Sequence, residues 1–429
     1  MKNFVFLCGE KGPNQKVHIS FHKVTQRRDM INYNEALEII KSEIEKLNLQ
    51  TEEVDLFESL NRILAENVIA DVDLPPFDNS AVDGYAIKFS ERKQWNIIGE
   101  ISAGNYSSFT LTENDAVLIT TGSKLPLNAD TIIPIEDVEV DGTKLFLKEN
   151  SLIKKGMNIR AQGNDLRKNE IAVPRFTKID PKTMAVLASC GKDKVKVYSK
   201  LEFAVLATGD ELIPVNQKPE GDKIRVSNIY SLYGAIKEMN HKIINLGFTK
   251  DDREFITQKI KAALELNINI LITTGGVSVG KYDFLKEVFE EQGIIEKFWK
   301  VNIKPGKPIY FGIYEKNDKR ILVFGLPGNP VSSLVNFYVF IKPALEFLFN
   351  QSPLNKIKAI LQNDLKKNDG KRHFAMGVLY NENDEWKVTS RVSQSSGNLV
   401  EMNRANCLII IEEERRNPKK GEIVKCILI

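Results

Sequence analysis

Between residues 201 and 350, apolar runs of strand length alternate with segments whose apolar residues recur at helical spacing. The runs EFAVLATG, NILITTGG and ILVFGLPG each end in glycine, and a helical pattern follows each, after a longer connection in the first case. Continuously apolar strands that alternate with helices are typical of a parallel sheet covered on both faces. The pattern predicts a doubly wound α/β domain, which would bind its ligand at the carboxyl ends of the strands.

Different patterns flank this region on both sides. Residues 35–49 place apolar side chains at helical spacing and predict one amphipathic helix. Residues 65–150 change to short β-rich runs separated by Gly, Pro and Asn, which predicts a mixed β domain. The segment 181–191 has a helical pattern, and the runs after residue 355 predict a small terminal β barrel or sandwich.

A chain of 429 residues exceeds what one hydrophobic core usually supports, so we expect a multidomain α/β protein. The expected units are an N-terminal extension at 1–30, a linking α/β subdomain made of 31–69 and 166–200, a β-rich subdomain at 70–165, the doubly wound domain at 201–350 and a β-barrel-like domain at 351–429.

Composition narrows the classes of function. Lys and Arg number 60 against 57 Asp and Glu, and the net charge of +3 gives no field that would hold nucleic acid or an anionic membrane. The four cysteines lie far apart, without a CxxC pair, which fits a reducing cytoplasm. Residues 321–341 are uncharged, but Gly325, Pro327, Gly328 and Pro330 interrupt them, which favours a buried strand, a tight loop and a buried helix over a membrane span.

The segment GGVSVGKYD at 275–283 is close to a phosphate-binding P-loop. Gly275, four further residues, Gly280 and Lys281 match that pattern, but Tyr282 stands where the P-loop has the Ser or Thr that ligates magnesium. On this motif alone, a damaged nucleotide site and a different anion site both stay open.

Four other loops carry polar residues that a connector does not need. They are PPFDNSAVDGYA at 75–86 with Asp78 and Asp83, ATGDEL at 207–212 with Asp210 and Glu211, IKPGKP at 303–308 with Lys304 and Lys307, and LPGNPVSS at 326–333. Each alone has a structural explanation, such as an Asx turn or a helix start. Together they combine glycine amides and lysines, which bind oxyanions, with carboxylates, which bind divalent metals or move protons. We therefore expect an enzyme that acts on a phosphate-like or oxyanion substrate with the help of a metal.

A series of motifs along the chain resembles, in the same order, the motifs of the molybdopterin molybdenumtransferases. They are PPFDNSAVDGYA, TGSKLPLNAD with IPIED, GMNIRAQGNDL, LATGDEL, TTGGVSVGKYDF, IKPGKP and GLPGNPVSS. This family is the MoeA type of molybdenum insertase and includes the E domain of gephyrin. The resemblance runs from about residue 31 to the carboxyl end. It implies that molybdate is joined to the dithiolene sulfurs of adenylylated molybdopterin, with release of AMP and active molybdenum cofactor, assisted by Mg²⁺ or another divalent cation.

The resemblance also implies an architecture and partners. Four subdomains would form an elongated homodimer, and both chains would contribute to the active cleft. Adenylylated molybdopterin and molybdate would be the substrates, and transient contacts with the adenylylating enzyme and with acceptor molybdoenzymes would follow.

The family's functional residues carry over by position. The catalytic set is Asp83, Thr121, Asp165, Glu211 and Asp283, of which Asp83 would reach the partner's cleft and Glu211 and Asp283 would hold the metal. Gly275, Gly276 and Ser278 would hold the adenylate end. Lys304, Lys307, Pro308 and Ser396 would neighbour molybdate, and the other substrate-binding positions are Pro327, Asn329, Pro330, Ser332 and Lys371.

The chain departs from the family pattern at a few positions. Lys371 stands where the family usually has Arg, with Arg372 beside it, and Lys binds an oxyanion as a point charge without the Arg fork. The sequence leaves open which of the two residues contacts molybdate. Val226 replaces a usual Asp, and Ser395 replaces a usual Gly.

Two other classes of function compete with molybdenum insertion. A P-loop ATPase would need the hydroxyl that Tyr282 replaces and a Walker-B acid, which LATGDE imitates only loosely. A peptide-docking scaffold, as gephyrin is at synapses, would use the dimer and the terminal domain, but the sequence shows no fused second domain or long linker. Molybdenum insertion is the favoured interpretation.

Overall fold

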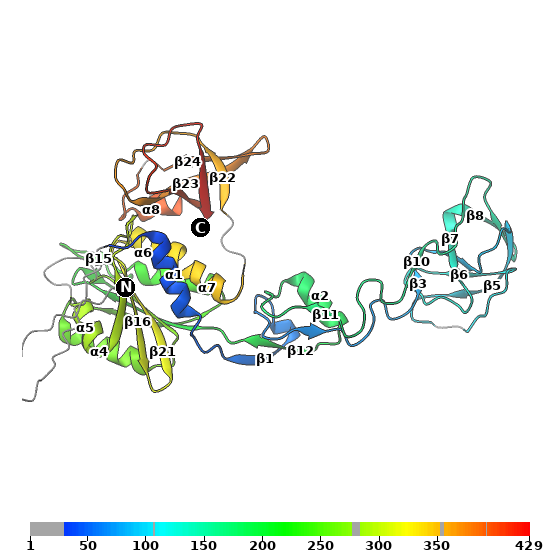
Figure 1. Cartoon of the computed structure of the whole chain (residues 1–429), viewed down its shortest axis with the longest axis horizontal. Coiled ribbons are helices and arrows are strands. Elements are labelled where there is room, and N and C mark those ends of the chain that lie inside the picture. The colour runs from blue at the N-terminus through cyan, green and yellow to red at the C-terminus, as the bar shows by residue number, and fades with distance from the viewer. Residues whose placement is uncertain (1–29, 106–107, 277–283, 352–355, 392) are drawn as a thin grey trace, which may run out of the picture.

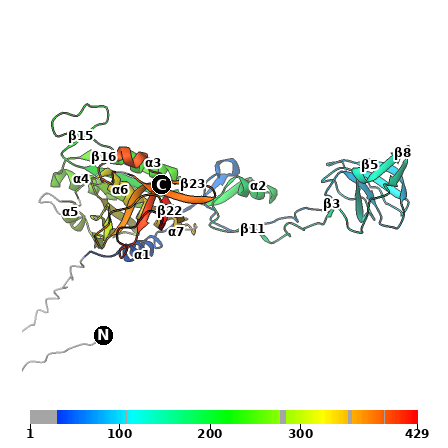
Figure 2. The same ribbon diagram turned by 90° about the horizontal axis from the view of Figure 1, so that it is seen from above.

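A computed structural model describes residues 30–105, 108–276, 284–351, 356–391 and 393–429, which form an elongated molecule (Figure 1). An α/β domain and a β barrel lie together at one end, and a β-rich domain lies at the other. A slender linking domain joins the two ends, as a second view also shows (Figure 2).

The central sheet of the α/β domain has the strand order β16-β13-β17-β21-β20-β18. The first four strands run parallel, as predicted, whereas β20 and β18 add an antiparallel edge that the sequence pattern did not reveal. Asn317 and Asp318 both have positive φ and form the two-residue turn between β20 and β21, a conformation that Asn and Asp favour. The strands are β13 (Glu202–Thr208), β16 (Lys242–Thr249), β17 (Ile270–Thr274), β18 (Ile294–Trp299), β20 (Tyr310–Lys316) and β21 (Lys319–Leu326).

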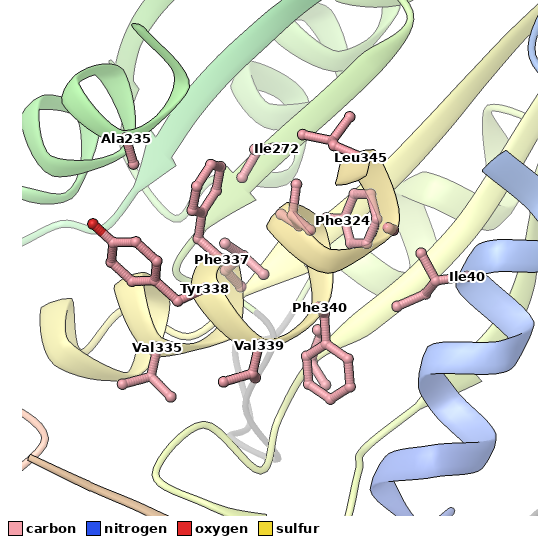
Figure 3. Packing of buried hydrophobic residues seen from close by; sticks show 14 of the residues in the cluster. Ile40, Ala235, Ile272, Phe324, Val335, Phe337, Tyr338, Val339, Phe340 and Leu345 are labelled. Atoms are coloured by element: carbon pink, nitrogen blue, oxygen red, sulfur yellow. The ribbon is translucent and has the colours of Figure 1, made fainter. Parts of the chain in front are cut away.

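Helices cover both faces of this sheet because alternate strand residues point to opposite sides. Phe203 and Val205 pack in the core of one face with α3, α6, η3 and α7, whereas Ala204 and Leu206 pack on the other face with α4 and α5. Figure 3 shows the first of these cores, in which Phe324 meets residues of the helix that follows β21. The helices are α3 (Asn228–Glu238), α4 (Arg253–Glu265), α5 (Leu285–Glu291), α6 (Pro330–Asn336), the π-helix η3 (Phe337–Ile341) and α7 (Lys342–Leu348). Two short strands, β14 (Leu212–Ile213) and β15 (Ile224–Arg225), pair with each other beside the sheet.

Among the described residues, one helix is long and apolar enough to cross a membrane, Pro330–Leu348. Within the protein, 67% of its most apolar window is buried. The apolar run of the sequence is thus a buried strand, a loop and a core helix, as its Gly and Pro residues predicted.

The first helix, α1 (Tyr33–Ile44), is shorter than the predicted span of 35–49. Asn32 caps it by accepting a hydrogen bond from the Glu35 backbone N–H. It packs against α7, and Glu43, which is 6% exposed, forms ion pairs with Lys297 and Arg320 of the α/β domain. Although we grouped this segment with the linking region, its contacts attach it to the α/β domain.

Two separate segments of the chain form the linking domain, and the β-rich domain is inserted between them in the sequence. In the linking domain β1 (Thr51–Asp55) pairs with β12 (Lys194–Tyr198), β2 (Val68–Ile69) pairs with β11 (Ile171–Val173), and η1 (Leu56–Glu58) and α2 (Pro181–Ser189) pack beside them. The pair β3 (Asn79–Ser80) and β10 (Ile159–Arg160) leads to the β-rich domain. That domain is a sheet of order β7-β4-β6-β5-β9-β8, with β4 (Gly84–Ile87), β5 (Gln94–Ile101), β6 (Asp115–Ile119), β7 (Thr131–Pro134), η2 (Ile135–Asp137), β8 (Val138–Asp141) and β9 (Lys144–Leu147).

The C-terminal domain is a closed barrel, the first of the two forms that the sequence predicted. Strand β23 pairs with both β24 and β25, which closes the sheet β23-β24-β22-β26-β25 on itself. Strand β19 (Ile303–Lys304), from the lysine-containing loop, adds to β23 and so ties this loop to the barrel. The barrel elements are β22 (Ile357–Leu361), β23 (Arg372–Glu382), β24 (Glu385–Ser390), α8 (Leu399–Asn403), β25 (Cys407–Ile411) and β26 (Ile423–Leu428).

Candidate functional site

The loops that leave the carboxyl ends of β13, β17 and β21 approach one another closely. A Cβ atom added to Gly275 would lie 2.2 Å from the Thr208 carbonyl oxygen, and one added to Gly328 would lie 3.5 Å from the Gly275 Cα. Gly275 also has a φ of +92°, which disfavours any side chain. Three backbone segments therefore meet here, and the approach of Gly275 to Thr208 is one that only glycine permits.

Carboxylates from two neighbouring strands line the same edge. Asp210 and Glu211 follow β13, and Asp251 follows β16, with its backbone N–H donating to Asp210 Oδ1 over 3.2 Å. Burial raises the pKa of Asp251, the Thr208 side chain beside it acts against this shift, and the negative charges of Glu211 and Asp210 raise the pKa further. Asp251 Oδ1 and Thr274 Oγ1 are buried without a hydrogen-bond partner in the described part of the chain, so polar atoms at this edge await a ligand, water or the adjoining segment.

Asp251 is the functional candidate that the sequence patterns did not identify. It directly follows a parallel strand, as Asp210 does, and this position is the signal that could have revealed it. The sequence pattern does not indicate strand β16, because Asn245 and Gly247 interrupt its apolar residues.

A divalent cation fits the chemistry of these donors. Mg²⁺ prefers oxygen ligands, and Glu211, Asp210 and Asp251 provide carboxylate oxygens at one edge. In the described ranges, no group of His, Cys, Asp or Glu has the arrangement of a complete metal site. The second predicted metal ligand, Asp283, and the predicted substrate residue Ser278 lie outside the described residues.

The proline-containing loop 326–330 is fixed to its neighbours by buried amides. Asn228 Nδ2 donates to the Gly328 carbonyl over 2.8 Å, and Asn336 Nδ2 donates to the Gly306 carbonyl over 3.2 Å. Pro330 begins α6, so Pro327, Asn329, Pro330 and Ser332 sit at the start of this helix. Since Asn336 ends the same helix, α6 connects the proline loop to the loop that carries Lys304, Lys307 and Pro308.

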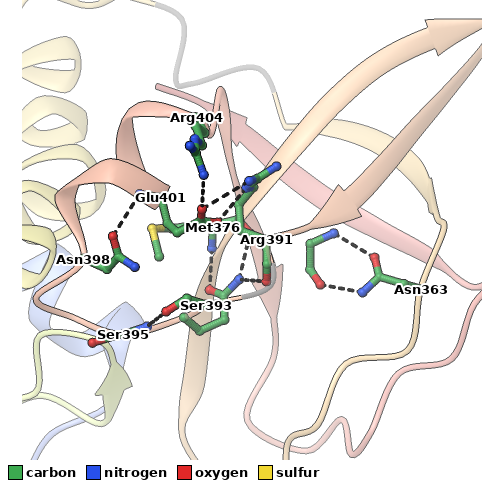
Figure 4. Close-up of polar contacts among 10 residues, drawn as sticks. Asn363, Met376, Arg391, Ser393, Ser395, Asn398, Glu401 and Arg404 are labelled. Carbon is green, nitrogen blue, oxygen red and sulfur yellow. Dashed lines mark hydrogen bonds and ion pairs between the residues drawn. The ribbon is translucent and has the colours of Figure 1, made fainter.

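The barrel contributes Ser396 to this group of loops. The Ser396 carbonyl accepts a hydrogen bond of 3.0 Å from the Val331 backbone N–H at the start of α6. Figure 4 shows how the Ser396 loop is held. The Gln394 side chain exchanges hydrogen bonds with the Met376 backbone at 2.8 and 2.9 Å, and Glu401 forms ion pairs with Arg391 and Arg404.

The structure distinguishes Lys371 from Arg372. The Arg372 guanidinium lies over the Tyr33 ring, donates to Glu413 Oε2 over 3.0 Å and donates to Asn34 Oδ1 over 3.0 Å, so it points toward α1. The Lys371 backbone N–H donates to Asp369 Oδ1, and the same oxygen is 2.7 Å from His373 Nε2. The Lys304 charge lowers the pKa of both Asp369 and His373, after larger contributions from burial and hydrogen bonds, so Lys304 lies beside this group.

The remaining predicted catalytic residues lie far from these loops in the same chain. Asp83 accepts hydrogen bonds from the Thr121 backbone N–H at 2.7 Å and from Thr121 Oγ1 at 2.8 Å, and these bonds lower the pKa of Asp83. Asp165 forms an ion pair with Arg160 between the linking and β-rich domains. Both groups belong to the arm on the far side of the linking domain from the α/β domain (Figures 1 and 2).

Three family models match successive parts of the chain. They describe the MoeA N-terminal region (domain I and II) at residues 31–191, a probable molybdopterin binding domain at residues 204–346, and the MoeA C-terminal region (domain IV) at residues 358–429.

Proteins of known name resemble the chain over most of its length. A molybdopterin molybdenumtransferase of Haemophilus influenzae is 37% identical over 385 residues, which cover 87% of this chain and 93% of that protein. A molybdopterin molybdenumtransferase of Bacillus subtilis is 32% identical, and the match covers 89% of this chain and 90% of that protein. The crystal structure of the molybdopterin biosynthesis moeA protein from Pyrococcus horikoshii OT3 matches with a TM-score of 0.79 at 30% identity, over 94% of this chain and 100% of that one. The chain belongs to the molybdopterin molybdenumtransferase family of the MoeA type.

Proposed function

We propose that the protein inserts molybdate into adenylylated molybdopterin and releases AMP and active molybdenum cofactor. The observation that carries this proposal is the meeting of carboxylates, closely packed glycines and lysine-bearing loops at one edge of the central sheet. A substrate with a phosphoanhydride and a second, tetrahedral oxyanion needs these two kinds of group close together.

The residues divide by chemistry into two ends of the site. Gly275 and Gly276, with Ser278, hold the adenylate end. The Gly275 backbone N–H donates to the Leu326 carbonyl over 3.1 Å, so Gly275 positions this loop and does not itself donate to the phosphate. Lys304, Lys307, Lys371 and Ser396 hold molybdate, since ammonium groups and hydroxyls donate to a dianion. Pro327, Asn329, Pro330, Ser332 and Pro308 shape the wall between them.

The carboxylates act on the phosphoanhydride through a divalent cation. Glu211 and Asp283 hold Mg²⁺, and Asp251 and Asp210 add negative charge beside Glu211. A cation held by these carboxylates would supply positive charge beside the phosphate oxygens of the anhydride.

Two copies of the chain form the active protein in this proposal. Asp83, Thr121 and Asp165 belong to an arm that ends far from the glycine loops of its own chain. A homodimer in which each arm reaches the partner's cleft brings Asp83 and Thr121 to the reaction. We place this dimer in the cytoplasm, where transient contacts would deliver the adenylylated substrate and pass the product to acceptor molybdoenzymes.

The test is to incubate the purified protein with adenylylated molybdopterin, molybdate and Mg²⁺ and to measure AMP. We expect AMP release that falls sharply when either molybdate or the divalent cation is omitted. A parallel reaction with ATP tests the P-loop alternative. Turnover of ATP without turnover of the adenylylated pterin would overturn the proposal.

A further inference from the structure

A second cavity, of about 500 Å³, lies at the opposite edge of the central sheet. Lys200 precedes β13 and His241 precedes β16, so the cavity is at the amino ends of these strands, whereas the carboxylates and glycines are at the carboxyl ends. Its other walls come from η3 and α7 and from the linking domain. This volume falls within the range of roughly 300 to 1,000 Å³ that is typical of small-molecule sites.

Positive charge exceeds negative charge along the cavity wall. The lining contains Arg62, Lys178, Lys200 and Lys342, against Glu238 and Glu346. Burial lowers the pKa of Lys200, and the positive charges of Arg62, Lys237 and Lys242 lower it further, whereas the negative charge of Glu52 raises it. Such crowding of cations opposes their charged forms, and a bound anion would relieve it.

Arg62 is preorganised at this wall. Its side chain is only 8% exposed, and Nη2 donates to the Tyr198 carbonyl over 2.8 Å. Glu52 also contacts Arg62, but Glu52 does not line the cavity. A guanidinium that is fixed by other contacts and lines a cavity is suited to hold a phosphate group.

His241 supplies an unpaired polar atom at the same place. Its ring lies between Phe203 and Phe349, at centroid distances of 5.7 and 5.9 Å, and burial lowers its pKa to about 4, so the imidazole is neutral at physiological pH. Nδ1 has no hydrogen-bond partner within the described ranges. A buried ring nitrogen without a partner is costly to keep unless a ligand or water completes it.

Apolar side chains form another part of the wall. Met239, Tyr338, Leu345 and Phe349 line it, and Figure 3 shows the Tyr338 ring between η3 and the helix that carries Ala235. A ligand here would thus meet cations on one side and apolar side chains on the other.

The geometry points to a binding site for a small phosphate monoester in this cavity, with the phosphate on Arg62 and Lys200, a polar contact to His241 Nδ1 and an apolar organic group against Tyr338, Leu345 and Phe349. The site is independent of molybdenum insertion, and nothing in its test uses the pterin substrate.

Phenyl phosphate is the probe, because it joins a phosphate monoester to one apolar ring. Calorimetric titration of the full-length protein at fixed ionic strength should show saturable binding. Lys200→Gln should weaken it about 10-fold, as expected for loss of a charge-assisted contact, and Lys342→Gln, which removes a positive charge from the same wall, should also weaken it. His241→Phe keeps a ring between Phe203 and Phe349 but removes Nδ1, and it should weaken binding as well.

Two charge-matched controls separate this cavity from other anion sites. Lys196→Gln removes an exposed lysine of β12 that does not line the cavity, and Lys307→Gln alters the molybdate loop at the opposite edge. Both should keep the binding event that Lys200→Gln weakens, whereas any separate binding of phenyl phosphate at the molybdate loop should be lost in Lys307→Gln alone. Affinity that is unchanged in both Lys200→Gln and Lys342→Gln, or lost in Lys307→Gln instead, would overturn the site. Inorganic phosphate that binds as tightly as phenyl phosphate would overturn the assignment to an ester.

Discussion

At Asp251, a single substitution should change stability and activity in opposite directions. Burial and two neighbouring carboxylates raise its pKa above the unfolded value of about 3.9, so the folded state loses stability as pH rises through the folded pKa. Asp251→Asn removes the charge. We therefore predict a higher Tm than the parent at pH 7 and no such gain below about pH 4, where both states are protonated.

The same substitution should slow the reaction. A carboxylate that supports charge at the phosphoanhydride contributes on the order of 100-fold in rate. Asp252→Asn is the matched control, because Asp252 caps α4 through the Glu254 and Phe255 backbone N–H groups and Asn caps equally well. Normal AMP release by Asp251→Asn would make Asp251 a structural residue.

Gly306 and Asn336 form a second pair that can be tested at this scale. A Cβ on Gly306 would lie 2.5 Å from Asn336 Nδ2, and the Gly306 φ is +92°. Gly306→Ala should therefore destabilise the protein by about 1 to 3 kcal/mol and raise the KM for molybdate by displacing the lysine loop. Adding Asn336→Ala removes the clash but not the φ strain, so urea denaturation should show less loss in the double variant than the sum of the two single losses. Strict additivity would contradict the contact.

Among the elements, the loop before α8 connects barrel stability to the substrate site. The Gln394 side-chain amide bonds both the N–H and the carbonyl of the Met376 backbone, as a neighbouring strand would. Without this side chain, the partly buried Met376 N–H has lost its partner. Gln394→Ala should cost about 1 to 3 kcal/mol in the free energy of unfolding. It should also raise the KM for molybdate, because the same loop carries Ser396.

Asn363→Ala is the control for this loop. Asn363 exchanges hydrogen bonds of 2.6 and 2.9 Å with Ser390 in the same barrel, on the opposite side of the picture from the labelled Ser395 (Figure 4). Thermal denaturation should show a loss in both variants, whereas steady-state kinetics should show a changed KM in Gln394→Ala alone. Equal kinetics would mean that the loop does not position Ser396.

Elements were predictable from sequence where the local pattern decides the structure. The apolar runs of β13, β17 and β21 and the helical spacing of α3 and α4 correctly indicated a doubly wound sheet, and the order of the motifs indicated the family. The antiparallel edge of β18 and β20 was missed because strand direction depends on nonlocal pairing. Asn317 and Asp318 were the available sign of a hairpin.

Site residues were harder to group than elements. Glu211, Gly275 and Gly328 meet because parallel strands end at one edge, and this could be inferred from topology. The direction of Arg372 could not be inferred, since it depends on Glu413 and Tyr33, which are distant in sequence. The roles of Asp83, Thr121 and Asp165 remain predictions.

On the scale of the whole molecule, the long arm predicts complementation between defective chains. Asp83→Ala damages the arm and Glu211→Ala damages the cleft, so each homodimer should be inactive. Coexpression should give mixed dimers with one intact site each, and about a quarter of the parent activity for random pairing in a two-fold symmetric dimer. Inactive mixed dimers, or a fully active monomer on sizing, would contradict a shared site.

The rate of molybdate-dependent AMP release by Glu211→Gln shows whether the carboxylates at the sheet edge take part in the reaction. Glu211 stands among the carboxylates at the carboxyl edge, whereas Glu265, at the end of α4, is exposed on the α/β domain and serves as the matched control in Glu265→Gln. We predict a loss of about 100-fold or more for Glu211→Gln, with a Tm near that of the parent and parental turnover in the control. AMP release at the parental rate by a folded Glu211→Gln protein would contradict the account.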